Sequence, residues 1–237
     1  MKINFIGTGG FGSLTKRSSS GYFIKDECLY IIDMGADNVK YYKKYLMNNE
    51  VKEIIICVTH THPDHAAGIP EFLIWVSFFY DKQKRVELVA TKEVLACLKH
   101  LLAVTGCNNF LHNVMFNEDY GVITTIETKH VKVIPSCAFI FRDDDRKKTL
   151  YSGDTNEPLL KKFEDFCLTY KLIPHKIYHE VSEKKTPVHT SLEELEVDFN
   201  KTTLLKKQDV VLFHCEESKT LKESGFELAV QKNVVAE

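Results

Sequence analysis

The sequence predicts an α/β fold in which two mixed β-sheets pack together and helices cover the outer faces of the sheets. Two observations support this prediction. Short apolar runs of strand length come in clusters, and helical patterns are interspersed with them later in the chain. No Pro-, Gly- or Ser-rich linker divides the 237 residues. We therefore expect a single domain over residues 1–237.

The elements of the first half follow from apolar patterning and turn residues. Strands are expected at residues 2–6, 21–25, 29–33, 53–59 and 86–90, helices at 37–47 and 92–103, and a mixed loop at 106–121. The run Glu53–Thr59 is almost wholly apolar, as is typical of a strand buried on both faces. The segment Phe72–Tyr80 is apolar nearly all round, so it is either buried in the core or covered by a partner. We favour a homodimer interface there.

The second half continues with more strands. Strands are expected at residues 122–127, 131–134, 138–142, 149–152, 176–179 and 209–214, and helices at 158–166 and 192–199. The loop at 106–121 is a candidate lid over a pocket that could reach a neighbouring subunit, and a plain surface loop remains equally compatible with its sequence.

Composition excludes several classes of protein. Hydrophobic residues make up 44% of the chain, which is enough for a packed core. The net charge of −2 argues against a general nucleic-acid coat protein. The seven cysteines include no Cys-x-x-Cys pair, and neither a signal-peptide run nor a membrane-spanning run is present. These features predict a cytoplasmic protein with free thiols and no membrane partner.

The most informative stretch is Thr59-His-Thr-His-Pro-Asp-His65, which directly follows the apolar run. On an extended segment alternate side chains point the same way, so His60 and His62 can converge on one ion. The turn at Pro63 redirects the chain, so Asp64 and His65 can face a second ion. Imidazole and carboxylate groups are ligands for zinc, manganese or iron, and the stretch therefore predicts a metal site.

This stretch resembles the His-x-His-x-Asp-His signature of the metallo-β-lactamase superfamily, which implies an αββα sandwich. Four later or earlier positions are also similar to motifs of that superfamily: Asp33 in an Asp-x-Gly at a strand end, His130 before a strand hairpin, Asp154 in Ser-Gly-Asp-Thr, and His214 at the end of an apolar strand. The resemblance should therefore cover nearly the whole chain.

The resemblance also implies a set of roles for two divalent ions, which would be zinc or manganese. One ion would be held by His60, His62 and His130, the second by Asp64, His65 and His214, and Asp154 would bridge them. Asp64 would also take the proton of the attacking water, and Asp33 would orient a ligand from behind. Such a site carries a positive charge although the chain is acidic, so it should attract an anionic phosphodiester.

Two further motifs narrow the resemblance to the ribonuclease Z branch. Tyr178-His-Glu-Val-Ser182 resembles its His-Glu-Ala-Thr motif, and Val188-His-Thr-Ser191 resembles its His-Ser-Thr motif. By analogy Glu180 pairs with His189, and His189 helps to protonate the leaving oxygen. A carboxylate partner raises the pKa of an imidazole, which suits a proton donor. His179 is expected to support the fold or the neighbouring site residues rather than to bind metal.

The chain differs from ribonuclease Z in a feature that bears on the substrate. That branch carries a long arm for transfer RNA between the positions that match His130 and Asp154, and only 23 residues separate them here. We therefore expect no transfer RNA and a small phosphodiester instead. Compact proteins of this kind are similar to the cyclic-nucleotide phosphodiesterases of the superfamily, such as the phage anti-Pycsar family. This implies hydrolysis of 3′,5′-cyclic CMP or UMP, in the host cytoplasm if the chain is viral.

Three other functions remain compatible with the sequence. The chain could be an RNA 3′-end endonuclease without its arm, or a thioester or lactone hydrolase. It could also be a non-catalytic scaffold, although degenerate members usually lose metal ligands and none is lost here. The metal, the preferred base and a viral or bacterial origin stay open at this stage.

Overall fold

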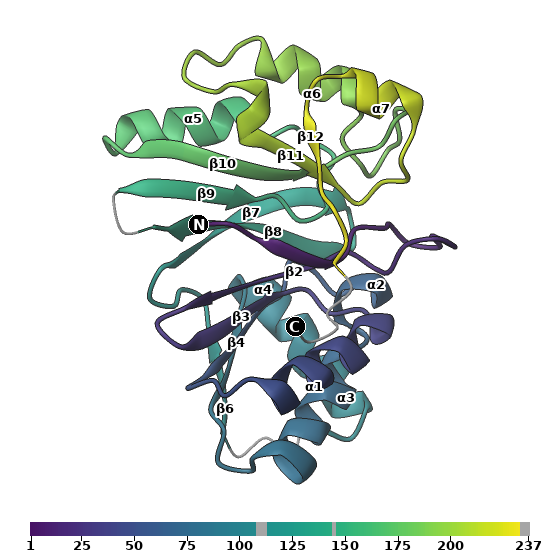
Figure 1. The fold of residues 1–237 in the computed structure, drawn as a ribbon, viewed down its shortest axis with the longest axis vertical. Helices are drawn as coiled ribbons and strands as arrows, with labels where there is room; N and C mark the ends of the chain where they lie inside the picture. The colour runs from purple at the N-terminus through teal and green to yellow at the C-terminus, as the bar shows by residue number, and fades with distance from the viewer. Residues whose placement is uncertain (108–112, 144–145, 233–237) are drawn as a thin grey trace.

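A computed structural model describes residues 1–107, 113–143 and 146–232, and it contains two six-stranded sheets (Figure 1). The first sheet has the order β1 (Asn4–Gly7), β2 (Ser20–Lys25), β3 (Cys28–Ile32), β4 (Ile54–Cys57), β5 (Val86–Val89), β6 (Val114–Asn117). The second has the order β12 (Glu227–Leu228), β11 (Val210–Phe213), β10 (Ile173–Glu180), β9 (Lys147–Tyr151), β8 (Ile134–Arg142), β7 (Ile123–Val131). Each sheet is mixed, because three antiparallel strands are followed by strands that run parallel.

Helices cover the outer faces of the two sheets. The α-helices are α1 (Val39–Asn48), α2 (Pro63–Ala66), α3 (Ile69–Trp75), α4 (Lys92–Val104), α5 (Leu160–Thr169), α6 (Leu192–Phe199) and α7 (Lys219–Glu223). In Figure 1, α1 and α3 lie below the first sheet, and α5, α6 and α7 lie above the second. The predicted arrangement of two mixed sheets with helices outside is therefore confirmed. No described helix is both long enough and apolar enough to cross a membrane.

Side-chain alternation in the second sheet separates two hydrophobic cores. Phe139 and Phe141 of β8 point toward the first sheet, where the rings of Phe141 and Phe23 lie 5.2 Å apart. Ala138 and Ile140 of the same strand belong to the other core, which contains residues of α5 and α6. This period of two is what a strand with both faces buried requires. The two cores fix the sheets and their helices as stacked layers.

Several predicted boundaries were wrong. Residues 131–134 form the turn of the β7–β8 hairpin rather than a separate strand, since Val131 pairs with Ile134. The expected loop at 106–121 contains β6, which pairs in parallel with β5 and forms the edge of the first sheet. Part of the lid expected there, residues 108–112, lies outside the described residues. The short elements α7 and β12 were not predicted, because neither has enough residues to show a period.

The apolar segment at 72–80 is divided between the core and the surface. Phe72, Leu73 and Val76 are buried, whereas Phe78 and Phe79 are 58% and 77% exposed. A π-helix, Val76–Tyr80, follows α3 directly and turns the last two phenylalanines outward. The core interpretation is therefore right for one face of this segment, and an apolar surface remains on the other.

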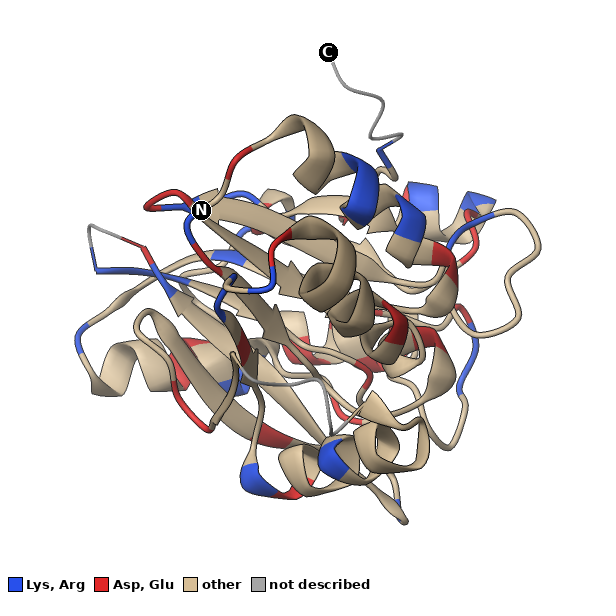
Figure 2. Ribbon diagram, turned by 90° about the horizontal axis from the view of Figure 1, so that it is seen from below, with Lys and Arg blue, Asp and Glu red and all other residues tan. Residues whose placement is uncertain are grey.

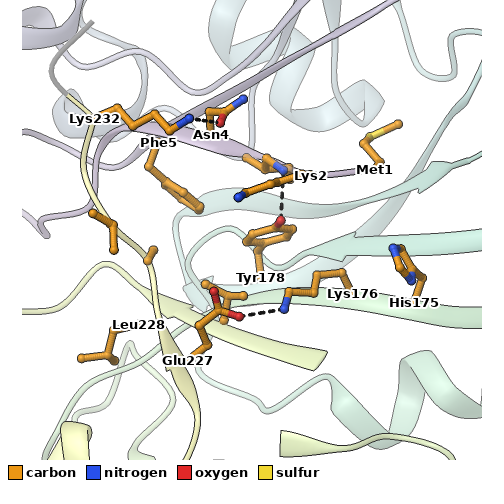
Figure 3. A pocket seen from close by; sticks show the side chains of 14 residues that line it. Met1, Lys2, Asn4, Phe5, His175, Lys176, Tyr178, Glu227, Leu228 and Lys232 are labelled. Atoms are coloured by element: carbon orange, nitrogen blue, oxygen red, sulfur yellow. Dashed lines mark hydrogen bonds and ion pairs between the residues drawn. The ribbon is translucent and has the colours of Figure 1, made fainter. Parts of the chain in front are cut away.

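The C-terminal segment ties the two sheets together at their open side (Figure 3). After β12 the chain crosses to β1, where the Lys232 amide donates to the Phe5 carbonyl at 2.7 Å. A hollow between the sheets is lined there by residues of β1, β10 and the C-terminal segment, and the Ile3 amide donates to the Tyr178 hydroxyl at 3.0 Å. This hollow contains none of the predicted site residues.

Candidate metal centre

The predicted site residues lie where strands of both sheets end. Asp33 follows β3, His60 follows β4, Asp154 follows β9, and His214 follows β11. Glu180 is the last residue of β10, His130 is the next-to-last residue of β7, and Asp64 and His65 lie in α2. Side chains from the carboxyl ends of parallel strands meet at one edge of an α/β sheet, and here the two sheets bring their edges together.

Three of these strand ends pass through the left-handed region of backbone conformation. The φ angles are 58° at Asp33, 59° at Gly153 and 61° at His214. At Gly153 a Cβ atom would lie 2.7 Å from the Thr59 side chain, so only glycine fits between Asp154 and the histidine motif. Asp33 and His214 adopt this conformation with a side chain, which costs on the order of 1–3 kcal/mol and is common at functional sites.

Three imidazole nitrogens converge on one point. His62 Nδ1 lies 2.9 Å from His60 Nε2 and 3.2 Å from His130 Nε2. Asp154 Oδ2 lies 3.9 Å from His60 Nε2 and 3.8 Å from His130 Nε2. Tetrahedral zinc ligands with metal–nitrogen bonds of about 2.0–2.1 Å would have similar spacing. These four residues could therefore hold one metal ion.

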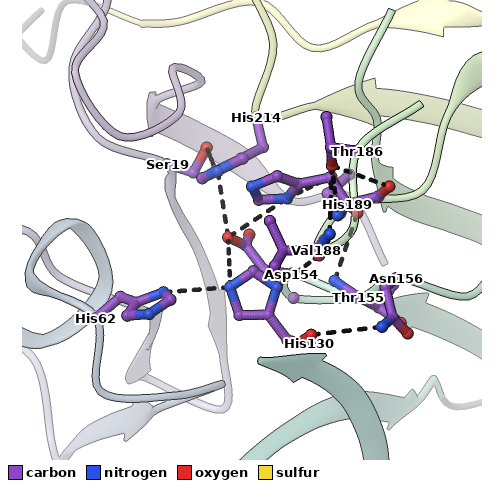
Figure 4. A network of polar contacts seen from close by, with 12 residues as sticks. Ser19, His62, His130, Asp154, Thr155, Asn156, Thr186, Val188, His189 and His214 are labelled. Atoms are coloured by element: carbon purple, nitrogen blue, oxygen red, sulfur yellow. Dashed lines mark hydrogen bonds and ion pairs between the residues drawn. The ribbon is translucent and has the colours of Figure 1, made fainter. Parts of the chain in front are cut away.

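A second group lies on the other side of Asp154. Asp64, His65 and His214 form a group with metal-ligand spacing. His65 Nε2 is 3.4 Å from both Asp64 Oδ2 and Asp154 Oδ1. His214 Nε2 is 3.2 Å from Asp154 Oδ2 (Figure 4). Asp154 thus faces both groups, as a bridging carboxylate must.

The other ring nitrogens of these histidines have their own partners. His130 Nδ1 donates to the Val188 carbonyl at 2.6 Å, and His214 Nδ1 donates to Ser19 Oγ at 3.2 Å. His60 Nδ1 donates to Thr59 Oγ1 at 3.0 Å. These bonds fix the tautomers and leave Nε2 of each ring with a free lone pair that points into the site.

Asp33 connects the two ends of the motif. It accepts hydrogen bonds from the Thr59 amide and hydroxyl, both at 2.7 Å, and from His65 Nδ1 at 2.8 Å. Its exposed fraction is zero. Asp33 is therefore in a position to orient His65 directly and His60 through the Thr59 hydroxyl.

Burial controls the protonation of the imidazoles. Burial lowers the pKa of His60 and of His130, and lowers the pKa of His214 to about 4. Burial alone would also lower the pKa of His65, but the carboxylates of Asp154 and Asp33 outweigh it and raise the value well above normal. Three rings are thus neutral and ready to bind a cation, whereas a cation at the second group would have to displace a proton.

The residues fit a divalent metal by a further criterion. Asp64 Oδ2, His65 Nε2 and Asp154 Oδ1 are buried polar atoms without a hydrogen-bond partner. Buried polar atoms are nearly always paired, so three orphaned atoms around one point indicate a missing ligand. Imidazole nitrogens and carboxylate oxygens are the donors that zinc and manganese accept.

Glu180 and His189 lie beside the two groups. His189 Nδ1 is 3.3 Å from Glu180 Oε2 and 3.8 Å from Asp154 Oδ2. Burial raises the pKa of Glu180 to about 7. Burial opposes protonation of His189, but the carboxylate of Glu180, 3.3 Å away, outweighs this and raises the pKa of the imidazole. The pair can therefore hold a proton next to the metal groups near neutral pH.

Comparison with known proteins decides the family. A family model described as anti-Pycsar protein Apyc1 matches residues 1–234.

The chain belongs to the anti-Pycsar Apyc1 family.

Relatives and solved structures agree with this assignment. The anti-Pycsar protein Apyc1 of Paenibacillus harenae is 26% identical over 216 residues, which are 82% of this chain and 83% of that protein. The crystal structure of human tRNase Z, short form, has a TM-score of 0.68 and 17% identity, covering 97% of this chain and 96% of its own. The metallo-β-lactamase fold protein YhfI of Bacillus subtilis has a TM-score of 0.66 and 13% identity, covering 95% and 94%. These two structures show the metallo-β-lactamase fold. Membership of the Apyc1 family, together with the cluster of ligand-type side chains, supports a metal-dependent hydrolase.

All predicted site residues of this Apyc1-family chain come together except one. His179 points away from the metal groups: its Nδ1 donates to the Glu180 carbonyl at 2.6 Å, and its Nε2 accepts from the Leu159 amide at 3.1 Å. This is the supporting position expected for it. The sequence interpretation missed Thr59, Ser19 and the Val188 carbonyl as partners of the histidines. Thr59 could have been found, because it adjoins the motif, whereas the other two come from distant loops.

Substitution of Asp33 by asparagine should weaken metal binding by about 10–100-fold, because asparagine keeps the shape but loses the charge that orients and polarises His65. Competition with a chromophoric chelator measures this affinity. Asp165 is an exposed residue of α5, so Asp165→Asn is the matched control and should bind metal as the wild type does. An unchanged affinity in Asp33→Asn would contradict the orienting role.

His179 should make the stability of the metal-free protein depend on pH. Burial lowers its pKa to about 4, whereas an unfolded histidine has a pKa of about 6.5. Its contribution is therefore fully present above about pH 6.5 and is lost as the pH falls toward 4. From pH 7 to pH 5 the wild type should lose about 2 kcal/mol more unfolding free energy than His179→Gln. Urea unfolding at the two pH values measures these losses, and His100→Gln, at an exposed histidine, is the control. Equal losses in the wild type and in His179→Gln would contradict the prediction.

Proposed function

We propose that this chain is a metal-dependent phosphodiesterase that hydrolyses 3′,5′-cyclic nucleotides to nucleoside monophosphates. The observation that carries the proposal is membership of the anti-Pycsar Apyc1 family over residues 1–234. By the resemblance described above, the substrates would be cyclic CMP and UMP signals of antiviral defence, and the protein would act in the cytoplasm, that of the host if the chain is viral.

The proposal assigns the two groups of side chains to two divalent ions, zinc or manganese, because imidazole nitrogens and carboxylate oxygens are donors that both metals accept. His60, His62 and His130 would hold one ion, and Asp64, His65 and His214 the other, with Asp154 between them. When bound, such ions supply positive charge for the phosphoryl oxygens and a nucleophile from water at neutral pH.

The remaining roles belong to the chain's own residues. Asp64 lies at the site with Oδ2 unpaired, so it can accept the proton of the attacking water. His189 would donate a proton to the ribose oxygen as its bond to phosphorus breaks, and Glu180 would hold the imidazole in the required orientation. Attack on phosphorus, cleavage of one P–O ester bond and this proton transfer together give a nucleoside monophosphate.

The short stretch of sequence between His130 and Asp154 supports a small substrate. The hairpin strand β8 and strand β9 occupy most of this interval, which leaves no length for an RNA-binding arm there. In Figure 2, Lys and Arg lie interspersed with Asp and Glu around the molecule. Transfer RNA is therefore not proposed as a substrate, and no membrane partner is proposed.

The chain is further proposed to form a single domain over residues 1–237 and to associate as a homodimer. Phe78 and Phe79 support the dimer, because they expose apolar surface beside a hollow that they share with Asn113 and Val114 at the edge strand β6. Light scattering of wild type and Phe79→Lys tests it: the variant should be monomeric, and a monomeric wild type would reject the dimer.

A substrate panel tests the proposed function. Purified, zinc- or manganese-loaded protein should convert 3′,5′-cyclic CMP, UMP, AMP or GMP to monophosphates and leave precursor transfer RNA intact. Cleavage of the RNA without hydrolysis of any cyclic nucleotide would instead assign the chain to the RNA endonucleases. Hydrolysis of thioesters or lactones alone would also reject the proposal.

A further inference from the structure

The loop after β1 carries two exposed apolar side chains at its tip. Phe11 is 78% exposed and Leu14 is 99% exposed. Gly12 between them has a φ of 78°, so the chain turns sharply there. In Figure 1 this loop projects beyond the sandwich on the side of α2, which carries Asp64 and His65. Single exposed apolar residues are ordinary, but two of them in a loop beside the candidate metal centre need an explanation.

The loop is anchored to the wall of the metal centre. The Ser13 and Thr15 hydroxyls both donate to the carboxylate of Glu216, that of Thr15 at 2.8 Å. Lys16 Nζ donates to the Cys215 carbonyl at 3.1 Å. Both acceptors follow His214 directly in the chain. These contacts hold the tip of the loop in a defined place relative to His214.

The loop also contacts the metal centre itself. At Gly10 a Cβ atom would lie 3.1 Å from His214 Nε2, so the backbone of the loop packs closely against the imidazole. A hollow lined by residues 10–15, His214 and Glu216 runs from the loop tip to His214, one member of the second group of ligand-type residues. Phe11 and Leu14 are therefore apolar lining residues of a hollow that reaches His214, whose Nε2 atom lies 3.2 Å from Asp154 Oδ2.

We propose that Phe11 is the platform on which the heterocyclic base of the substrate stacks, with Leu14 extending the apolar wall. The inference rests on the proposed function, because only a nucleotide substrate brings a base to this place. In a cyclic nucleotide one ribose separates base and phosphate, so a phosphate held between the two groups of ligands puts the base within reach of the hollow. A phenyl ring has no hydrogen-bonding group, so it distinguishes a base from no base but not one base from another.

Kinetics of Phe11→Ala test the platform. Stacking on one aromatic ring changes binding by about 5–150-fold, so KM for a cyclic nucleotide should rise by about ten-fold or more. The contact is made equally in the ground and transition states, so kcat should stay within about two-fold. Phe11→Tyr should behave as wild type. Tyr170→Ala, which removes an exposed ring at the end of α5, is the control and should also be unchanged.

An abasic substrate separates the base contact from other effects of the loop. For 1-O-methylribose 3′,5′-cyclic phosphate, wild type and Phe11→Ala should have equal kcat/KM. An equal loss for both substrates would show a disturbed metal centre and overturn the proposal. An unchanged KM of Phe11→Ala for the cyclic nucleotide would also overturn the proposal. If Phe11→Ala had unchanged kinetics but a changed oligomeric state, the loop would instead be assigned to contacts between copies of the chain.

A binding measurement separates this inference from the proposed function. In Phe11→Trp, cytidine monophosphate should quench the new indole fluorescence, and ribose 5-phosphate should not; the signal of Trp75, the one natural tryptophan, is subtracted using wild type. If the wild type hydrolyses no cyclic nucleotide, the proposed function fails, and this quenching alone tests whether a base stacks on residue 11. Equal responses to cytidine monophosphate and ribose 5-phosphate would reject base stacking there.

Discussion

His62→Ala is expected to lower kcat/KM for cyclic nucleotides by at least about a thousand-fold. Its Nδ1 atom faces His60 Nε2 at 2.9 Å and His130 Nε2 at 3.2 Å, so alanine removes one of three nitrogens that meet at one point. His62 is only partly buried, and the fold should survive its loss. Activity and metal content by mass spectrometry are measured together, and bound metal should fall by roughly one ion per chain.

His100→Ala provides the matched control, because His100 is an exposed histidine of α4. It should keep both full activity and full metal content. Near-normal activity in His62→Ala would reject metal-dependent catalysis at this site altogether. Lost activity with unchanged metal content would contradict the assignment of His62 as a ligand.

His189→Ala should have an effect that depends on the leaving group. General acid catalysis contributes about 10²–10⁴-fold, so kcat for a cyclic nucleotide, whose ribose oxygen must be protonated, should fall by that factor. A substrate such as bis(p-nitrophenyl) phosphate releases a phenolate that needs no proton, and its hydrolysis should fall by less than about ten-fold. Stopped assays with both substrates measure the two ratios.

The partner of His189 gives a second test of the same step. Glu180→Gln keeps the size of the side chain but removes the carboxylate charge that raises the pKa of His189. It should show the same preference for the activated substrate, in a milder form. Glu193→Gln, an exposed glutamate of α6, is the control. Equal losses for both substrates would mean that the pair acts on the metal centre and not on the leaving oxygen.

Much of this site was predictable because its most informative part is local. His60, His62, Asp64 and His65 lie within six residues after a buried strand, so their spacing alone predicts one pair of ligands for each of two neighbouring ions. His130, Asp154 and His214 were found only through resemblance, because nothing in their own neighbourhoods states which distant strand end they will meet. The two sheets were predictable for a similar reason, since strands buried on both faces form apolar runs.

The parts that were missed depend on long-range contacts. Ser19 has no neighbouring residue that marks it as a partner of a histidine, and its bond to His214 spans 195 positions in the chain. Strand β6 has only four residues and a mixed pattern, and its pairing with β5 makes it a strand. Phe11 also has no local signal, because an exposed phenylalanine acquires a meaning only when the fold puts it beside a site.

The distribution of ligand-type residues between the two sheets has a consequence for how fast the protein is degraded in a cell. His60, His62, Asp64 and His65 come from the first half of the chain, and His130, Asp154 and His214 from the second. Each ion would therefore act as a cross-link across the seam between the halves, and would add free energy that grows with the logarithm of the free metal concentration. The resistance of the chain to cellular proteases would then follow the supply of metal, so that a metal-starved cell clears the protein faster than a replete one.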